Sequence, residues 1–346
     1  MSGAEGAAEY AGARMRMVVA SLAAVLLGLA VVGCGGDGAE PGAPQRATLV
    51  LDFTPNAVHS GIYVALRRGY YRDAGVDLGV HAPSASTDAP KLLEAGRTQF
   101  AILDIHDLGI AREHGLNLVG VAPIVQRPLA SVIARADGPV RRPRDLEGRR
   151  VGVTGLPSDD AVVDSEVAAD GGDPAKVDRV TIGFNAVADL AAGKVDAATG
   201  FWNAEAVALE GQRVPVRVFR VDRYGAPPYP ELVLTTTRGV LQKDPGLVRS
   251  MVRATTRGYE ETLRDPPAAL DDLLASNPGL DRSVQQEQLR VLLPAFRPPG
   301  ALDAAVLRRW AEWDRKHGIL RRPLAVSRAF DLRASSSARS GVRPSG

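Results

Sequence analysis

The chain has 346 residues, of which 45% are hydrophobic and 24% are charged, and its formal net charge is +2. This length allows one large or two medium α/β domains, each with a buried core. The near balance of charge, with basic residues spread along the chain, gives no reason to expect a nucleic-acid partner.

The N-terminal segment carries a targeting pattern. Arg14 and Arg16 precede an apolar stretch, residues 17–30, which is too short to span a membrane comfortably and runs into Val31-Val32-Gly33-Cys34. Cys34 is the single cysteine of the chain, and this arrangement resembles a bacterial lipobox. An uncleaved anchor and an ordinary buried cysteine are the alternatives. We expect a signal peptide over residues 1–33, lipidation of Cys34, and an extracytoplasmic protein tied to the cell membrane through its lipid anchor.

Two further segments have compositions that do not build a core. Residues 34–46 are rich in Gly, Pro and Ala, which predicts a flexible tether. Residues 331–346 are dominated by Ser, Arg and Gly towards their end, which predicts a disordered tail. With its one cysteine assigned to the anchor, the mature chain is expected to have no disulfide and no thiol chemistry.

Between these segments, apolar runs alternate with stretches of helical spacing. Strands are expected at residues 48–53, 76–81, 100–103, 118–123, 131–135, 150–153, 180–182, 197–199, 216–219 and 231–236. Helices are expected between most of them, at 60–68, 88–95, 106–114, 158–170, 186–192 and 203–210, and the chain is helical from Asp244 onwards. This alternation predicts an α/β protein with parallel sheets and right-handed crossovers.

Two composition breaks divide the α/β region into two lobes. The Pro- and Arg-rich segment 137–144 is interpreted as the first crossing between lobes, and the Pro- and Gly-rich segment 224–230 as the return. The expected first lobe therefore comprises residues 47–136 and 231–330, and the second lobe residues 137–230.

Motifs of the common enzyme classes are absent from the mature sequence: there is no nucleophile elbow, P-loop, zinc-protease helix or dinucleotide fingerprint. The five histidines are scattered. No metal site, no cofactor and no catalytic residue are therefore predicted.

The candidate ligand residues follow the carboxyl ends of strands, where open α/β sheets bind small molecules. They combine aromatic rings with a few amides and carboxylates, a set suited to a flat, polar heterocycle. The ligand-binding candidates are Phe53, Asn56, His59, Tyr63, Asp104, His106, Trp202, Asn203, Glu205 and Tyr229.

Several of these candidates also have structural interpretations that the sequence leaves open. Phe53 could belong to the core, and Asn56 could only shape the Thr-Pro-Asn turn beside His59. Asp104 could cap the helix that follows it, and Glu205 could only complement a helix dipole.

The segment Leu51-Asp52-Phe53-Thr54-Pro55-Asn56-x-x-His59-x-Gly61-Ile62-Tyr63-Val64-Ala65 is similar to the opening of the thiamin-pyrimidine-precursor family of substrate-binding proteins. Matching pieces continue through Gly200-Phe201-Trp202-Asn203-x-Glu205 and Tyr229-Pro230-Glu231, so the resemblance spans about Thr48 to Arg322. It implies the type II periplasmic-binding fold, with two lobes that close on a ligand like a hinged clamp. It also implies a monomer without cofactors, and two partners: an ABC permease and a heterocyclic small molecule, typically formylaminopyrimidine or hydroxymethylpyrimidine.

The same family includes the fungal pyrimidine synthase, which consumes an active-site histidine and uses a cysteine-rich loop, iron and pyridoxal phosphate. His106 corresponds to that histidine, whereas the segment Ala226–Glu231, where the cysteines belong, contains none. The resemblance therefore implies a binding protein and not an enzyme. Two features depart from the family pattern: Phe53, at a position where Trp is common, and the sequence Asp104-Ile105-His106. Riboflavin and taurine-like sulfonates therefore stay open as alternative ligands.

Overall fold

The computed structural model describes residues 44–85 and 87–337. The predicted signal peptide, Cys34 and most of the tether lie outside this part of the chain, as does the end of the predicted tail. Within it, no helix is both long and apolar enough to cross a membrane.

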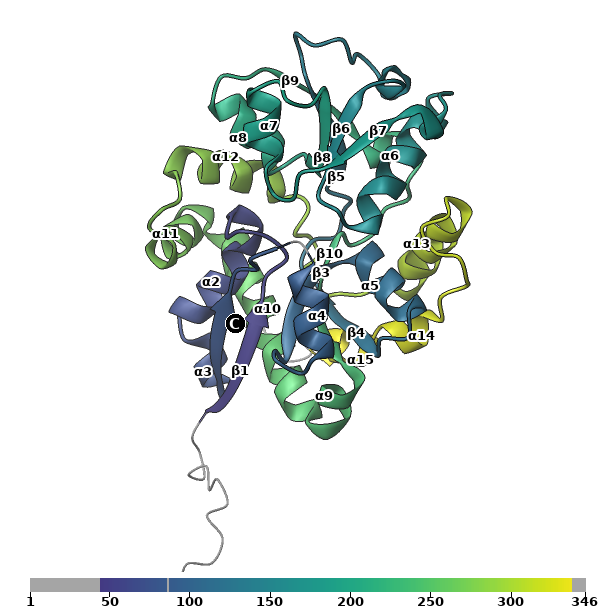
Figure 1. The fold of residues 1–346 in the computed structure, drawn as a ribbon. Coiled ribbons are helices and arrows are strands. Elements are labelled where there is room, and N and C mark those ends of the chain that lie inside the picture. The colour runs from purple at the N-terminus through teal and green to yellow at the C-terminus, as the bar shows by residue number, and fades with distance from the viewer. Residues whose placement is uncertain (1–43, 86, 338–346) are drawn as a thin grey trace, which may run out of the picture. The chain divides into compact units, whose positions relative to one another are not determined.

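Two five-stranded sheets form the framework (Figure 1). In spatial order, the first sheet contains β2 (Val76–His81), β1 (Gln45–Val50), β3 (Phe100–Asp104), β10 (Leu232–Thr237) and β4 (Leu118–Pro123). The second contains β7 (Asp178–Thr181), β6 (Arg150–Val153), β8 (Ala197–Phe201), β5 (Ala130–Arg135) and β9 (Val216–Arg220).

The sheets are mixed, which corrects the prediction of parallel sheets. In the first sheet β10 runs antiparallel to both neighbours, β3 and β4, and in the second β5 runs antiparallel to β8 and β9. Each of these two strands is the first that the chain forms after passing from one sheet to the other. Such a strand enters its sheet from the side facing the other sheet, so it runs against the strands beside it.

The first passage between sheets also differs from the prediction. Strand β5 was assigned to the first lobe, with the crossing at residues 137–144, but β5 pairs in the second sheet. The chain therefore leaves the first sheet between Pro123 and Ala130, and it returns between Arg220 and Leu232. The Pro- and Arg-rich segment instead forms a surface turn and the short 3-10 helix η2 (Pro143–Leu146) within the second half.

Helices cover both faces of each sheet. The first sheet is covered by α2 (Ser60–Arg67), α3 (Tyr70–Asp73), α10 (Pro245–Arg264), α11 (Pro266–Ser276) and α12 (Arg282–Leu292) around one core, and by α4 (Asp88–Glu94), α5 (Ile105–Glu113) and α13 (Ala304–Lys316) around the other. The second sheet lies between α6 (Pro157–Ala169) on one face and α7 (Ala186–Ala191) and α8 (Glu205–Gly211) on the other. The remaining short helices are α9 (Arg238–Lys243), α14 (Val326–Ala329) and α15 (Leu332–Ser337).

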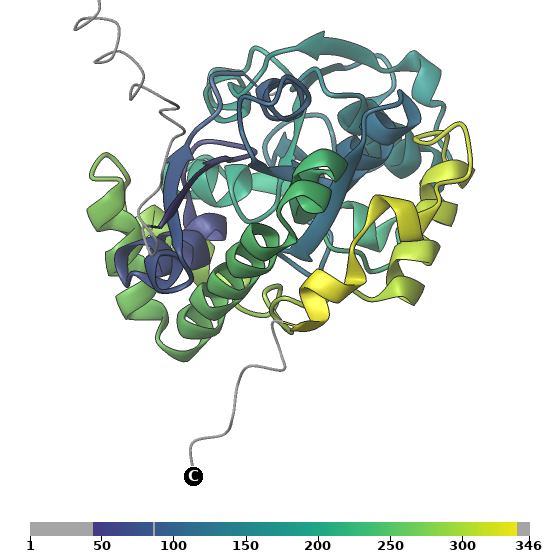
Figure 2. The same ribbon diagram turned by 90° about the horizontal axis from the view of Figure 1, so that it is seen from below.

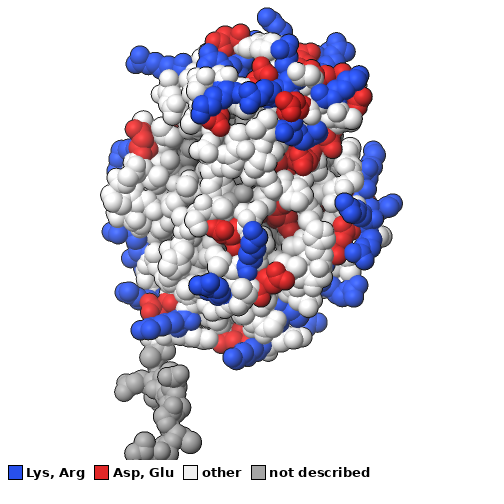
Figure 3. All heavy atoms as spheres, viewed as in Figure 1, with Lys and Arg blue, Asp and Glu red and all other residues white. Residues whose placement is uncertain are grey.

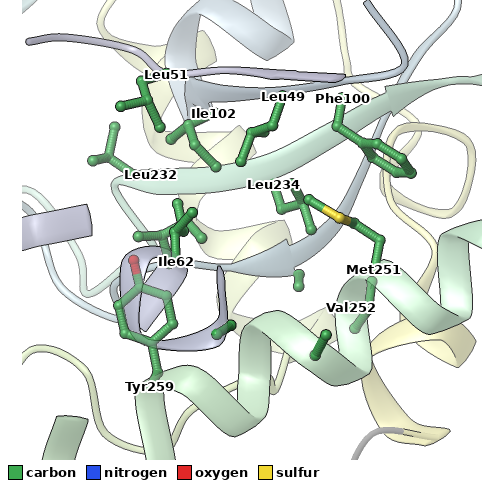
Figure 4. Close-up of a cluster of buried hydrophobic side chains, with 14 of the residues drawn as sticks. Leu49, Leu51, Ile62, Phe100, Ile102, Leu232, Leu234, Met251, Val252 and Tyr259 are labelled. Atoms are coloured by element: carbon green, nitrogen blue, oxygen red, sulfur yellow. The ribbon is translucent and has the colours of Figure 1, made fainter. Parts of the chain in front are cut away.

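The alternation of side chains along each strand explains these layers. In β3, Phe100 and Ile102 enter the core beneath α2 and α10, whereas Ala101 and Leu103 enter the core beneath α4 and α5. Figure 4 shows Phe100 and Ile102 among the first of these side chains, with Met251 from α10. Such strands are apolar on both faces, which is why they read as continuous apolar runs in the sequence.

The long helix α10 packs directly on α2, and Figure 2 shows it as the long green helix. Two glycines permit this approach: a Cβ atom on Gly258 would lie 1.9 Å from the carbonyl oxygen of Gly61. The Tyr259 hydroxyl donates a hydrogen bond of 2.7 Å to the carbonyl oxygen of Val58. This contact fixes the segment that precedes α2 against the core.

The start of the predicted disordered tail is helical. Residues 332–337 form α15, and Ala334 is buried in the first core. Phe330 forms an isolated bridge with Gly120 beside β4. Because α15 and its buried Ala334 extend the core past residue 330, the prediction of disorder from residue 331 is wrong at its start.

Candidate ligand-binding site

A cavity of about 110 Å³ lies between the two sheets, lined by segments that follow strand ends in both. The first sheet contributes residues from the loop after β1 and from the end of β3. The second contributes the start of β5, the loops after β6 and β7, and the end of β8. The lining residues that could contact a ligand through polar atoms or aromatic rings are Asp52, Phe53, Asn56, Asp104, Asp107, Ser131, Thr154, Ser158, Asp159, Phe184, Thr199, Phe201, Asn203 and Glu205.

The loop after β1 is held by its own side chains. The Asn56 side chain accepts a hydrogen bond from the Val58 amide at 2.9 Å and donates one to the Thr54 carbonyl at 3.1 Å. His59 Nδ1 accepts from the Asn56 amide at 3.2 Å, so Nε2 carries the proton donated to Asp52 Oδ1 at 2.9 Å. Asn56 therefore caps η1 (Ala57–His59) while also lining the cavity, and the fully buried His59 orients Asp52 from behind the cavity wall.

Asn203 follows β8, and its amide is fully buried at the cavity wall. Neither its Oδ1 nor its Nδ2 has a hydrogen-bond partner among the described residues. Leaving a buried donor and acceptor unpaired costs about 1–3 kcal/mol each. The arrangement is therefore suited to a ligand that supplies one acceptor and one donor at adjacent positions.

Glu205 lies two residues further on, in the first turn of α8, and its carboxylate accepts the Phe201 amide at 2.8 Å. A Cβ atom on Gly200 would lie 3.1 Å from the same carboxylate oxygen, so glycine there leaves room for it. Burial raises the pKa of Glu205 to about 7. Its carboxyl group can thus accept a proton or a hydrogen bond from a ligand near neutral pH.

The charge of the cavity wall has one sign. Five acidic residues line the cavity, namely Asp52, Asp104, Asp107, Asp159 and Glu205, and none of its lining residues is Lys or Arg. Burial, together with the neighbouring Asp104, raises the pKa of Asp107 well above its ordinary range, and burial also raises the pKa of Asp159. On the surface shown in Figure 3, by contrast, basic and acidic side chains are intermixed. The cavity favours a cation or a neutral molecule rich in hydrogen-bond donors, and disfavours an anion.

Two phenylalanines meet across the cavity. Phe53 comes from the loop after β1 and Phe184 from the loop after β7, so they belong to different halves of the protein. Their ring centroids are 4.5 Å apart at 79°, an edge-to-face contact, and both are half-buried. Phe53 was predicted as a site residue. Phe184 was not, because a lone aromatic residue after a short, partly exposed strand carries little signal.

Of the remaining predicted residues, four do not line the cavity. Tyr63 is buried in the core around α2, where burial raises its pKa. Trp202 donates a hydrogen bond of 3.0 Å from Nε1 to the Pro128 carbonyl, and the Arg220 guanidinium lies 4.4 Å from its ring centroid. This position ties the indole to the segment that crosses between the sheets. Tyr63 and Trp202, both predicted as ligand-binding residues, are therefore not among the residues that line the cavity.

His106 and Tyr229, the other two, lie together behind Asp104. Their rings meet edge to face at 4.9 Å, and both side chains are fully buried. His106 Nδ1 lies 2.9 Å from Asp314 Oδ2. Burial alone would lower the pKa of His106, but the negative charges of Asp314, Asp104 and Glu231 outweigh it and raise that pKa to about 10. Neither residue is among those lining the cavity.

Asp104 joins this buried group to the cavity. It caps α5 by accepting the His106 amide at 2.7 Å, and it also lines the cavity. Burial and the adjacent Glu231 raise its pKa well above the ordinary value. The cap and the site interpretations of Asp104 are thus both compatible with its position.

Comparison with known proteins gives the family. Residues 56–269 match the family model described as NMT1/THI5 like. The chain belongs to the NMT1/THI5-like family. It is 31% identical to a formylaminopyrimidine-binding protein of Halalkalibacterium halodurans over 295 residues, covering 83% of this chain and 89% of the relative. This membership confirms the family predicted from the opening motif.

Other relatives of the chain differ in their named roles. The chain is 28% identical to the riboflavin-binding protein RibY of Chloroflexus aurantiacus, with 83% of this chain and 85% of the relative covered. It is 26% identical to a 4-amino-5-hydroxymethyl-2-methylpyrimidine phosphate synthase of Legionella pneumophila, with 73% and 80% covered. The two relatives of higher identity are named as binding proteins, which supports the prediction of a binding protein and not an enzyme.

Solved structures confirm the fold class. The alkanesulfonate-binding protein SsuA of Xanthomonas axonopodis pv. citri superimposes with a TM-score of 0.68 at 17% identity, covering 84% of this chain and 99% of that one. A Candida albicans protein described as having the generic periplasmic binding protein fold gives a TM-score of 0.66 at 14% identity, covering 83% and 96%. The predicted two-lobed periplasmic-binding architecture is therefore the fold of this family member.

Proposed function

We propose that this protein is the substrate-binding component of an ABC importer and that it binds an aminopyrimidine precursor of thiamin in the cavity between the sheets. Formylaminopyrimidine is the first candidate, because a relative at 31% identity is named for binding it. No chemical step is part of this function. The cavity grips the ligand and releases it to a permease.

The observation that carries this proposal is the pairing of Asn203 with Glu205 on one wall. An aminopyrimidine edge presents an exocyclic amine beside a ring nitrogen. The amine can donate to the Asn203 Oδ1 or to the Glu205 carboxylate, and the ring nitrogen can accept from Asn203 Nδ2 or share a proton with Glu205. The unpaired amide atoms of Asn203 and the raised pKa of Glu205 match this pattern.

The alternative ligands fit the cavity less well. A sulfonate would face five acidic residues and no Lys or Arg along the lining. The cavity volume of about 110 Å³ corresponds to roughly ten water positions. That volume suits one substituted pyrimidine ring better than the three fused rings and ribityl chain of riboflavin.

Closure of the two halves on the ligand is also part of the proposal. The Phe53–Phe184 contact joins the halves at the cavity, and separating these rings would open a path to it. The two passages of the chain between the sheets, residues 124–129 and 221–231, are the expected hinge. With Cys34 as a lipid anchor on the membrane, the protein would work as a monomer beside its permease.

The alternative function, a pyrimidine synthase, would need cysteines that this chain does not have at the corresponding segment. His106 is present, but Cys34 is the single cysteine, and it lies in the predicted lipobox far from the segment Ala226–Glu231. An intact-mass spectrum after incubation with iron and pyridoxal phosphate tests the point, since the synthase reaction would consume His106. We expect an unchanged mass.

Calorimetric titration tests the ligand. We expect saturable heat with formylaminopyrimidine or hydroxymethylpyrimidine and none with taurine. A strong signal with riboflavin and none with either pyrimidine would refute the ligand while leaving the fold and the importer role intact.

A further inference from the structure

A group of three metal-ligating side chains lies directly behind the cavity. Asp104 ends β3, His106 lies in the first turn of α5, and Glu231 directly precedes β10. Each offers one ligand atom, and these atoms all lie within 4.8 Å of one another. The Ile105 amide donates to the Glu231 carbonyl at 2.9 Å, so the antiparallel pairing of β3 and β10 holds the three residues in place.

In His106 and Glu231, one polar atom is fixed by the fold and another is free. His106 Nδ1 lies 2.9 Å from Asp314 Oδ2 and 3.1 Å from the indole Nε1 of Trp310. Glu231 Oε2 accepts the Leu129 and Ala130 amides at 2.5 and 3.0 Å. His106 Nε2 and Glu231 Oε1 have no hydrogen-bond partner in the described chain, although both side chains are fully buried. A histidine oriented by a carboxylate, with its second nitrogen free, is the usual arrangement of a metal ligand.

The charges of this group also point to a cation. Asp104, Glu231 and Asp314 place three carboxylates around the single imidazole of His106. Among the described residues, no Lys or Arg forms an ion pair with any of these three carboxylates. The N-terminus of α5 contributes only about half a positive charge. Buried carboxylates at this density are stabilised by protons shared among them or by a metal ion.

We propose that Asp104, His106 and Glu231 bind one divalent first-row transition ion, Zn²⁺ or Mn²⁺, behind the ligand cavity. Two carboxylates and one imidazole are donors that both ions accept, and three protein ligands leave a coordination position open. Because Asp104 also lines the cavity, the open position would be accessible from it. This site goes beyond the proposed transport function and does not depend on the identity of the transported ligand.

The test measures zinc binding by the untagged full chain. Protein is stripped with a chelator, dialysed against Zn²⁺, and analysed for bound metal by mass spectrometry, and Co²⁺ substitution reports the ligand field by absorption. We expect one ion per chain, and at least about tenfold weaker binding in the Asp104→Asn variant, because asparagine keeps the cap of α5 but loses the anionic ligand. Circular dichroism checks that the variant folds.

Matched control substitutions are available on β2. Asp77→Asn and His81→Gln replace an exposed carboxylate and an exposed histidine away from the site, and both should bind zinc like the wild type. Substoichiometric zinc in the wild type, or equal affinity in Asp104→Asn and wild type, would overturn the proposal and leave shared protons as the explanation. Pyrimidine titration of the chelator-treated protein separately tests the transport function.

Discussion

Replacing Glu205 by glutamine removes the charge of one cavity carboxyl while keeping its shape. The new amide oxygen can still accept the Phe201 amide, which now lies 2.8 Å from the carboxylate, so the first turn of α8 should stay in place. The lost interaction is the charge-assisted hydrogen bond from the ligand, worth about 1.5–3 kcal/mol. That loss corresponds to a roughly 10- to 150-fold rise in the dissociation constant.

The measurement is calorimetric titration with formylaminopyrimidine at pH 8, where Glu205, with a pKa of about 7, is mostly ionised. The matched control is Glu94→Gln, which removes a carboxylate from the exposed surface of α4 and should bind like the wild type. A Glu205→Gln variant that binds within about twofold of the wild type would show that this carboxyl does not contact the ligand.

Three further predictions concern stability and ligand release. Burial raises the pKa of Glu166 well above its ordinary value, so its stabilising contribution holds below about pH 4 and is lost as the pH rises. Glu166→Gln should therefore raise the free energy of unfolding at pH 7 by about 1–2 kcal/mol in denaturant titrations and leave it unchanged near pH 4. An equal increase in the free energy of unfolding at pH 4 and pH 7 would contradict this pH dependence. Phe184→Ala removes an edge-to-face contact worth about 0.5–1.5 kcal/mol and should speed ligand release roughly 2- to 12-fold in stopped-flow measurements, whereas an unchanged rate would argue against its place in the closed state. Gly258→Ala should lower the free energy of unfolding by about 2–3 kcal/mol, because the added methyl group would meet the Gly61 carbonyl; a neutral effect in thermal unfolding would refute that close packing.

Local patterns in the sequence were sufficient for most elements. The alternating apolar residues of β2, Val76–His81, and the helical spacing of α2, Ser60–Arg67, predict both elements to within a residue of their observed bounds. Strand direction and sheet membership were not predictable in the same way. Strand β5 follows β4 after a short connection and reads like its neighbour, and only its pairing with β8 and β9 reveals the crossing.

The residues of the candidate site were only partly predictable, because local sequence patterns do not show tertiary packing. A polar residue after a strand lies near the sheet edge, which brought Asp104, Asn203 and Glu205 to the cavity. Whether an aromatic ring at the same edge faces the cavity or the core depends on tertiary packing. Trp202 therefore lies against the Pro128 carbonyl, while the unpredicted Phe184 reaches the cavity.

A crystal structure of the protein grown with formylaminopyrimidine tests the central claim most directly. We expect one pyrimidine ring in the cavity, with its amine and ring nitrogen within hydrogen-bond distance of Asn203 and Glu205 and with Phe53 and Phe184 closed over it. A cavity without the pyrimidine, or a ring bound elsewhere while the Asn203 amide stays unpaired, would contradict it.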